Sequence, residues 1–540
     1  MLNSNNFNAQ EKALEFSHNH GFFTEKFDLH VTSSKENVTI KYTLNGKDPR
    51  SGVAQFSKTL PAVINIDPEN TLNRDIAPGV VLRITAIQAD TFITPTLTKT
   101  FMFVNKATRL SLDNVMPGSE WLNPNNSVQA INYGLDPNVY NHALYSGKLE
   151  NSLLSIPSLS LVTDLKGLFN LDTGIYVNAF KHGEEWERAA SLELLNPDGT
   201  EGFQINCGIR IRGGWSRNKD NPKRAFRVFF SSEYGDSKLR YPLFGDEGVD
   251  EFDKIDLRTS MNYSWAFYGD NSNTMLRDVF SRDSQRDMNQ PYTRSRYYHL
   301  YINGTYWGLF QTQERSEASF AENYFGGNRE DYDVIKVDVG EFFNLYHVEA
   351  TDGNLNAWKR LWDIGEAGYT DENYFRVQGL NTDGSLNIAY EKLIDVDNLI
   401  DYMICTFYAG DFDGPISSFR GNVSPNNFYA VYNRVNPDGF KFFRHDAEHS
   451  LFYNSWGTDR TGPYPAGTYF EDSNPQWLHQ RLSVNNNYKL KFADRVQKHF
   501  FDGGVFTQQS VQSRIGERKN QIESAIIAES ARWGDSKIEP

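Results

Sequence analysis

The first hundred residues alternate apolar and polar side chains with the period of two that half-buried strands show. Residues 27–31 and 38–42 follow this pattern, and the turn residues Asn45 and Gly46 come directly after the second run. Further strands are predicted over 81–86 and 98–103. Short strands separated by turn residues indicate a β-sandwich. The sequence therefore predicts a small all-β sandwich domain over residues 15–105.

The pattern changes after this domain. Residues 106–156 are rich in Asn, Pro, Gly and Ser, which predicts a linker or an irregular wrap. A β-hairpin is predicted over 297–310, and apolar residues near a period of 3.6 predict a buried helix over 393–410. The tail predicts two or three amphipathic helices. Strands and helices together indicate an α+β domain over residues 157–535.

The charge and hydropathy of the chain exclude two classes of partner. It carries 54 basic and 69 acidic residues, a formal net charge of −15, and no long basic block. Such a chain repels nucleic-acid phosphates, so we expect no nucleic-acid partner. No apolar run approaches the ~20 residues that span a bilayer. We therefore expect no membrane span.

A first candidate for chemistry is a glycine turn with basic residues. Residues 208–217 (GIRIRGGWSR) predict a strand and a turn that carry Arg212 and Arg217, and Lys223 opens the next strand. Glycines allow backbone amides to approach an anion, and basic side chains neutralise it. The pattern matches no standard nucleotide-binding motif. An ordinary hairpin with solvated basic residues fits it as well, and Arg258 and Arg277 are expected to form structural ion pairs.

A second candidate is a group of acidic and amide side chains. Asp411 and Asp413 follow the predicted helix, and Asn427 opens a strand. Asp446 and Glu448 end another strand and point to the same side because side chains alternate. These hard oxygen ligands suit Mg²⁺ or Mn²⁺. His445 and His449 suggest zinc less well, since no third ligand is suitably spaced, and a solvated acidic loop remains the alternative. Glu314, which ends the hairpin, either pairs with a lysine or begins a helix.

These segments in this order resemble the CotH (spore coat protein H) kinase family over roughly residues 157–500. The resemblance rests on GIRIRGGWSR followed by PKRAFRV at 222–228, NGTYWGLF at 303–310, and the later Asp413, Asn426-Asn427 and 445–448 (HDAE) segments. The segment 40–49 (IKYTLNGKDP) is similar to the chitobiase/β-hexosaminidase C-terminal-type module, an accessory β-sandwich of secreted bacterial proteins.

The resemblance to CotH kinases implies an atypical protein-kinase-like fold that uses ATP and Mg²⁺ or Mn²⁺. By position, Lys223 contacts the nucleotide phosphates with Glu314 as its partner carboxylate, and Arg212 and Arg217 are further phosphate contacts. Asp413 is the catalytic aspartate, with Asp411 as its competitor. Asn427 and Asp446 hold the metal, and Glu448 is a second acidic ligand. Such a set suits phosphoryl transfer, in which positioning and charge neutralisation do most of the catalysis.

The implied partner is a secreted or cell-surface protein with a Ser, Thr or Tyr acceptor, and the sandwich is a candidate contact for surface polysaccharide. We expect a bacterial protein that is exported after removal of a signal segment. The family's usual Trp-Asp-x-Asp is here HDAE, and its usual Gly-Asn-Ser turn is here Gly213-Gly214-Trp215. A catalytically silent pseudokinase that serves in adhesion or carbohydrate association is therefore the alternative. A glycoside hydrolase with paired carboxylates is a third reading, which the resemblance disfavours.

Overall fold

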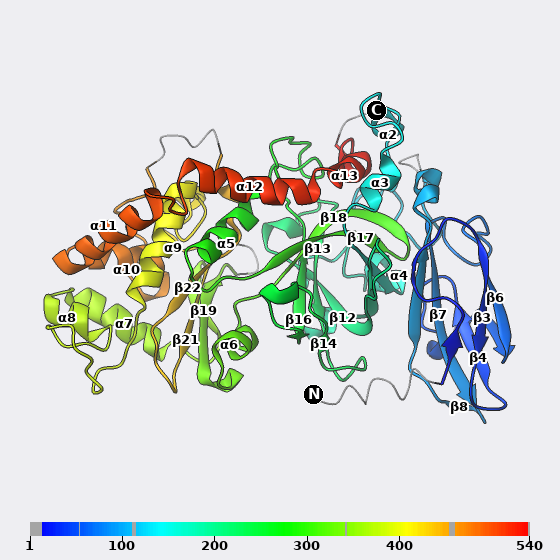
Figure 1. The fold of residues 1–540 in the computed structure, drawn as a ribbon, viewed down its shortest axis with the longest axis horizontal. Helices are drawn as coiled ribbons and strands as arrows, with labels where there is room; N and C mark the ends of the chain where they lie inside the picture. Colours follow the sequence, from blue (N-terminus) through cyan, green and yellow to red (C-terminus); the bar gives the residue numbers. More distant parts are fainter. Residues whose placement is uncertain (1–12, 53, 111–114, 341–342, 453–458, 538–540) are drawn as a thin grey trace.

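The computed structural model describes residues 13–52, 54–110, 115–340, 343–452 and 459–537. Three parts follow one another along the long axis: a β-sandwich, a β-barrel, and a sheet covered by helices (Figure 1). Strands and helices both contribute extensively, so the chain is an α+β protein. Among the described helices, each is too short or too polar to cross a membrane.

The β-sandwich consists of two sheets that share one hydrophobic core. The smaller sheet contains β1 (Glu15–Phe16), β3 (Phe27–Thr32) and β6 (Ala62–Ile66); the larger contains β2 (Gly21–Phe22), β9 (Leu97–Met102), β7 (Gly79–Gln88), β4 (Thr39–Thr43) and β5 (Phe56–Thr59), with β8 (Thr91–Phe92) beside β7. In β6 the buried Ala62, Ile64 and Ile66 alternate with exposed residues, as a half-buried strand requires. The four strands predicted over 27–31, 38–42, 81–86 and 98–103 are confirmed.

Buried hydrogen bonds join the sandwich to the barrel. Glu193, a fully buried barrel residue, accepts hydrogen bonds from the backbone amide of Thr100 at 3.0 Å and from its hydroxyl at 2.5 Å. The Nδ1 atom of His20 lies 2.8 Å from the same carboxylate. Gly79 donates to the Gly304 carbonyl at 3.1 Å, and a Cβ on Gly79 would lie only 2.7 Å from the Gly304 Cα. The sandwich is thus packed against the barrel and is not merely tethered to it.

Replacing Glu193 with alanine should destabilise the protein. The substitution removes the acceptor of two buried Thr100 donors, which costs about 1–3 kcal/mol in the free energy of unfolding. Urea denaturation measures this loss, and Glu201→Ala in the exposed loop after the same strand is the control. A Glu193→Ala midpoint equal to that of the wild type would show that these bonds contribute nothing.

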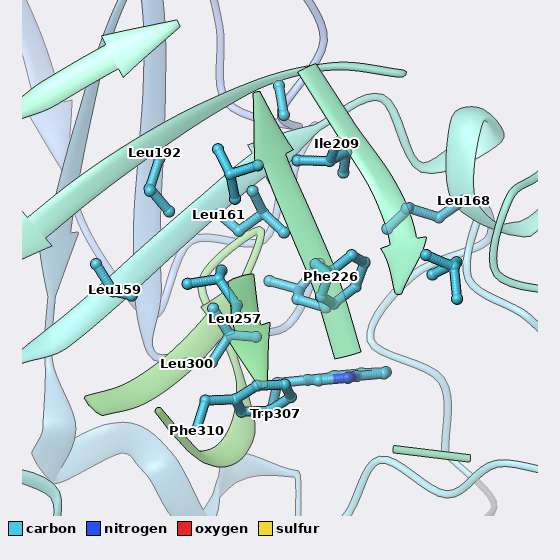
Figure 2. Packing of buried hydrophobic residues seen from close by; sticks show 14 of the residues in the cluster. Leu159, Leu161, Leu168, Leu192, Ile209, Phe226, Leu257, Leu300, Trp307 and Phe310 are labelled. Atoms are coloured by element: carbon cyan, nitrogen blue, oxygen red, sulfur yellow. The ribbon is translucent and has the colours of Figure 1, made fainter. Parts of the chain in front are cut away.

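The barrel is closed and filled with apolar side chains. Its strands are, in order, β10 (Ser158–Thr163), β11 (Arg188–Leu195), β12 (Gln204–Arg212), β13 (Ala225–Phe229), β16 (Lys254–Arg258), β18 (Thr305–Gln313) and β17 (Ser295–Ile302), with β10 and β17 pairing in parallel. Leu161, Ile209, Phe226 and Leu257 are fully buried and point into it (Figure 2). Because the interior is packed, a ligand must bind outside the barrel.

The hairpin β17–β18 confirms the predicted Asn-Gly turn. Asn303 and Gly304 both have positive φ angles, 45° and 79°, as a type I′ turn requires. The segment 106–156, predicted as a linker or a wrap, contains η2 (Val104–Arg109) in part, α2 (Pro137–Tyr140) and α3 (Leu149–Leu153). Trp121 and Tyr133 from this segment belong to the core of the barrel, so it wraps the barrel. The short helix α4 (Leu165–Phe169) and the small β14 (Leu239–Arg240)–β15 (Glu251–Phe252) sheet complete this part.

The third part is a four-stranded antiparallel sheet with helices. Its strands are β20 (His347–Asp352), β19 (Tyr332–Asp338), β21 (Phe428–Asn433) and β22 (Lys441–Arg444), and its helices are α5 (Arg277–Asp287), α6 (Ala318–Phe325), α7 (Asn356–Ala367), α8 (Asp371–Arg376), α9 (Val396–Ala409), α10 (Pro475–Leu482), α11 (Asn486–Phe500) and α12 (Gln508–Ile522). The helix predicted over 393–410 is α9, and the tail forms α11, α12 and α13 (Ile526–Trp533). The last of these returns to the barrel, where Trp533 donates to the Trp307 carbonyl at 2.8 Å (Figure 1).

Candidate functional site

A cavity of about 1010 Å³ lies outside the barrel, where β12, β13 and β16 face β19 and the segments that follow α9 and β22. Six of the eight residues predicted for the site line it: Arg212, Arg217, Asp413, Asn427, Asp446 and Glu448. Lys223 and Glu314 are not among its lining residues. The chain therefore brings its basic and acidic candidates to one place, from segments more than two hundred residues apart.

The basic wall of the cavity follows from strand alternation. In β13 the residues Phe226 and Val228 fill the barrel, so Arg227 between them points outward. Arg227 lies opposite Arg210 of β12 and Asp256 of β16 in the register of the sheet. The same outward face of β12 carries Arg212.

Three guanidinium groups share one carboxylate on this wall. Asp256 contacts Arg212 Nε at 2.9 Å and Arg227 Nε at 2.7 Å, and its Oδ2 lies 3.6 Å from Arg315 Nη1. All three arginines line the cavity. Arg315 also pairs with Glu317, which in turn pairs with Lys254. Three cations around Asp256 leave this surface with fixed positive charge, which favours an anionic ligand.

Two of the predicted phosphate contacts are engaged elsewhere. Arg217 lines the cavity, but its guanidinium donates to the carbonyls of Ile211 at 2.7 Å and of Lys181 at 3.2 Å, so it stabilises the glycine turn. Lys223 is 2% exposed and lies 2.6 Å from Glu529 of α13. Its ammonium also donates to the Leu309 carbonyl at 2.8 Å. Lys223 therefore fastens α13 to the barrel.

The predicted pairing of Lys223 with Glu314 is wrong. Glu314 is buried, lies 3.1 Å from Arg294 Nη1, and accepts a hydrogen bond from Tyr324. Burial raises the pKa of Glu314, and burial lowers that of Lys223. Lys223 pairs with Glu529, and Glu314 pairs with Arg294. Glu314 comes directly after β18, at a point where its side chain lies next to the segment that carries Arg294 and not next to the cavity.

Asp413 is the acidic residue that faces the cavity from the segment after α9. This helix ends at Gly410 in the left-handed conformation, and the chain then turns through Asp411 and Asp413. Ser417 donates its hydroxyl to Asp413 at 2.5 Å, and Asn427 donates its amide at 3.0 Å. Burial raises the pKa of Asp413 to about 7, although the Ser417 hydrogen bond opposes this shift. A carboxyl with this pKa can exchange a proton near neutral pH.

Asp411, the competing candidate, has a structural role. Its side chain is buried and forms an ion pair with Arg444, which is also buried. Burial raises the pKa of Asp411 and Arg444 opposes the shift. Asp411 is not among the residues that line the cavity. Of the two aspartates between which the spacing could not decide, Asp413 is therefore the one that a ligand in the cavity can contact.

Asp446 and Glu448 follow β22 and share the guanidinium of Arg258. Arg258 Nη2 contacts Asp446 Oδ1, and it lies 2.6 Å from Glu448 Oε1. The other oxygen of Glu448 accepts the Asn262 amide at 3.0 Å. Burial opposes ionisation of Asp446, but Arg258 holds its pKa at about 2. The expectation that Arg258 forms an ion pair is confirmed. All three residues of this ion-pair group line the cavity.

The nearby histidines and Arg277 have other contacts. The Tyr263 hydroxyl lies 2.6 Å from His449 Nδ1, and burial lowers the pKa of His449 to about 4. Burial also lowers the pKa of His445 well below its usual value. Arg277, expected to form an ion pair, instead lies 5.3 Å from the Tyr263 ring centroid and donates to the Ser272 carbonyl at 2.9 Å.

Strained backbone is concentrated around the cavity. Non-glycine residues with positive φ are uncommon, and they gather at ligand sites where the surrounding structure holds them. Six of them line this cavity, with φ between 44° and 67°: Tyr263, Tyr268, Phe343, Tyr346, Asn427 and Asp446. Two of the six are predicted metal ligands. The strain supports the cavity as the functional site.

Sequence reasoning missed much of the basic wall. Arg227 lies in the PKRAFRV segment between two apolar residues. This alternation could have predicted that Arg227 points away from the barrel core. Asp256 and Arg315 carry no such signal, because their meeting depends on β16 pairing with both β13 and β18. Lys336 of β19 also lines the cavity and lies 2.5 Å from Glu349.

Together these features define a protein whose cavity is lined by arginines of three barrel strands and by carboxylates of the segments that follow α9 and β22. The model of the CotH kinase protein family matches residues 209–539, and the chain belongs to this family. Membership indicates a kinase-type enzyme. The match begins within β12 and includes the whole acidic side of the cavity, whereas β10 and β11 precede it. A search of curated proteins gives no match to this chain.

Proposed function

We propose that the protein transfers the γ-phosphoryl group of ATP to a hydroxyl group of a protein, in a reaction that depends on Mg²⁺ or Mn²⁺. The acceptor is a Ser, Thr or Tyr side chain of a secreted or cell-surface protein. The observation that carries the proposal is that Arg212, Arg227 and Arg315, grouped around the carboxylate of Asp256, line the same cavity as Asp413, Asn427 and Asp446.

The charge of the two walls suits a nucleoside triphosphate. Guanidinium groups bind phosphate oxygens with paired hydrogen bonds. Here three of them share Asp256, and among the described residues only Arg315 has a second carboxylate partner, Glu317. Arg212 is 9% exposed and Arg315 12% exposed in their side chains, so a phosphate at this wall would be largely removed from water. Interactions with partly buried cations are stronger than those at an open surface. The volume of about 1010 Å³ is sufficient for a nucleotide.

The residues of the acidic wall fit a divalent cation. The Asn427 amide nitrogen is bonded to Asp413, which leaves its carbonyl oxygen as a ligand. The Asp446 side chain is 37% exposed, and one of its oxygens is not engaged by Arg258. Mg²⁺ typically takes one or two carboxylates and completes its shell with water and phosphate oxygens. When bound, the ion would neutralise charge on the phosphates; Asp446 and Asn427 would hold it, while Glu448 has both oxygens occupied by protein donors.

The remaining steps belong to Asp413. An acceptor hydroxyl next to Asp413 loses its proton to the carboxylate as its oxygen bonds to the γ-phosphorus, and the bond from that phosphorus to the bridging oxygen breaks. ADP leaves with the electron pair of the broken bond, and Arg212, Arg227 and Arg315 stabilise the charge that the phosphates carry. Ser417 and Asn427 fix the orientation of Asp413 for this proton transfer.

The rate should depend on pH through Asp413. The base acts in its ionised form, and its pKa is raised to about 7, so kcat/KM should fall about tenfold per pH unit below that value and level off above about pH 8. Initial rates of autophosphorylation from γ-labelled ATP, at saturating Mg²⁺, measure the profile. A profile that stays flat from about pH 6 to about pH 8 would remove Asp413 from this role.

The alternative of a silent kinase scaffold is tested by the same assay together with calorimetric ATP binding. Absence of transfer together with absence of ATP binding would favour the adhesion or carbohydrate-associated role, which also remains a proposal for the sandwich. ATP binding without transfer would instead indicate that the acceptor is missing from the assay.

A further inference from the structure

The side chain of Arg258 lies at the centre of three carboxylates. It ends strand β16 and is 1% exposed. Its Nη2 atom contacts Asp446 and lies 2.6 Å from Glu448, and its Nη1 atom lies 3.7 Å from Asp278 Oδ2. Asp278 comes from α5 and the other two from the segment after β22, so three separate segments supply the carboxylates and the guanidinium.

Asp446 is the open member of this group. Asp278 is buried and is also bound by Arg282 at 2.9 Å and by the Ala447 amide at 2.9 Å. Glu448 is bound through both oxygens, to Arg258 and to the Asn262 amide. Asp446 uses one oxygen for Arg258, and its side chain is 37% exposed in the cavity. An ion that enters the cavity can therefore contact Asp446, whose other oxygen is already paired with the buried Arg258.

We infer that Arg258 takes the place of a second divalent cation, so that the site takes one metal ion with its nucleotide where protein kinases of the common type take two. The inference rests on the proposed function, because it concerns the metal that accompanies ATP. Arg258 acts here as a positioning residue: it orients Asp446 and supplies fixed charge.

The charges explain why a second ion is excluded. A divalent cation between Asp446 and Glu448 would lie against the guanidinium, and like charges this close repel strongly where water is scarce. The guanidinium cannot lose its proton to make room. Its position is fixed by ion pairs with Asp446, Glu448 and Asp278.

Removing the guanidinium should convert the group into a metal site. Arg258→Met keeps much of the side-chain volume and leaves Asp278, Asp446 and Glu448 without their shared cation. Carboxylate oxygens are ligands that Mn²⁺ accepts, and the cation that repels the ion is then absent. Arg258→Lys retains a positive charge at nearly the same place and is the matched control.

The test is Mn²⁺ stoichiometry, measured by electron paramagnetic resonance of free Mn²⁺ during titration of the full chain with a non-hydrolysable ATP analogue. We expect one bound Mn²⁺ per nucleotide in the wild type and in Arg258→Lys, and two in Arg258→Met. Two ions in the wild type, or one in a folded Arg258→Met protein, would overturn the inference. If Arg258→Met does not fold, the wild-type stoichiometry and Arg258→Lys decide alone.

The failures of the two proposals are distinguishable in this experiment. A wild type that binds neither the analogue nor Mn²⁺ would contradict the proposed function, and the inference about Arg258 would fall with it. A wild type that binds the analogue with two ions would leave the proposed function intact and contradict only the role of Arg258.

Discussion

Replacing Asp413 with asparagine should lower the rate of phosphoryl transfer by about 10²–10⁴-fold, the usual contribution of a general base. ATP affinity should change little, because asparagine keeps the shape of the side chain. Its oxygen can still accept from the Asn427 amide, and its own amide can donate to the Ser417 hydroxyl, which reverses the direction of that hydrogen bond. Initial rates and calorimetric ATP binding, measured on the same preparations, separate the two effects. A variant with wild-type rates would show that another group accepts the proton.

The same substitution should stabilise the protein at alkaline pH. The folded pKa of Asp413, about 7, lies above the value of about 3.9 for an unfolded aspartate, so the native state binds this proton more tightly than the unfolded state. The wild type keeps this stabilisation at low pH and loses it as pH rises from about 4 through about 7. Asparagine does not titrate, so Asp413→Asn should gain stability relative to the wild type between pH 5 and about pH 8 in urea denaturation.

Asp411→Asn provides the matched control. Asp411 forms a buried ion pair with Arg444, and removal of one partner from such a pair typically costs about 3–5 kcal/mol. Asp411→Asn should therefore be less stable than the wild type at about pH 5 and also at about pH 8. If Asp413→Asn were destabilised in the same way, Asp413 would be a structural residue like its neighbour.

Replacing Arg227 with glutamine should weaken ATP binding by about 10–100-fold. Hydrogen bonds to charged groups contribute about 1.5–3 kcal/mol each, and tenfold in affinity corresponds to about 1.4 kcal/mol. Arg227 and Arg212 both pair with Asp256. When Arg227 is replaced, Asp256 therefore keeps Arg212 as a partner. The fold should therefore persist while the phosphate contact is lost.

Calorimetric titration with ATP and Mg²⁺ measures this effect, and Arg240→Gln is the control. Arg240 forms an exposed ion pair with Glu251 on the small β14–β15 sheet and does not line the cavity. Arg240→Gln should bind ATP as the wild type does. Equal affinities for Arg227→Gln and Arg240→Gln would show that the basic wall does not hold the phosphates.

The local elements of this fold could be predicted because they depend on neighbours in sequence. The hairpin around Asn303 and Gly304 follows from its turn residues, and α9 follows from a period of 3.6 in its apolar residues. The acidic group was also predictable in outline. Asp413 and Asp446 come shortly after a predicted helix and a predicted strand, and Asn427 directly precedes another strand. Because β21 and β22 are antiparallel, the start of one and the end of the other lie at the same end of the sheet.

The ion pairs could not be predicted, since they depend on which strands become neighbours. Lys223 pairs with Glu529, which lies 306 positions later, because α13 returns to the barrel at that point. Asp256 meets arginines from two other strands and a loop only once the barrel has closed. Arg258 beside apolar residues correctly suggested an ion pair, but nothing local showed that its partners would be two predicted metal ligands.

The most direct test of the central claim is calorimetric ATP binding to the wild type and to Asp446→Ala, each with Mg²⁺, with Mn²⁺ and with neither metal. We predict that the wild type binds ATP in a metal-dependent manner and that Asp446→Ala loses this dependence together with most of its affinity. Metal-dependent binding of equal strength in both proteins, or no binding in the wild type, would contradict the placement of the nucleotide and metal in this cavity.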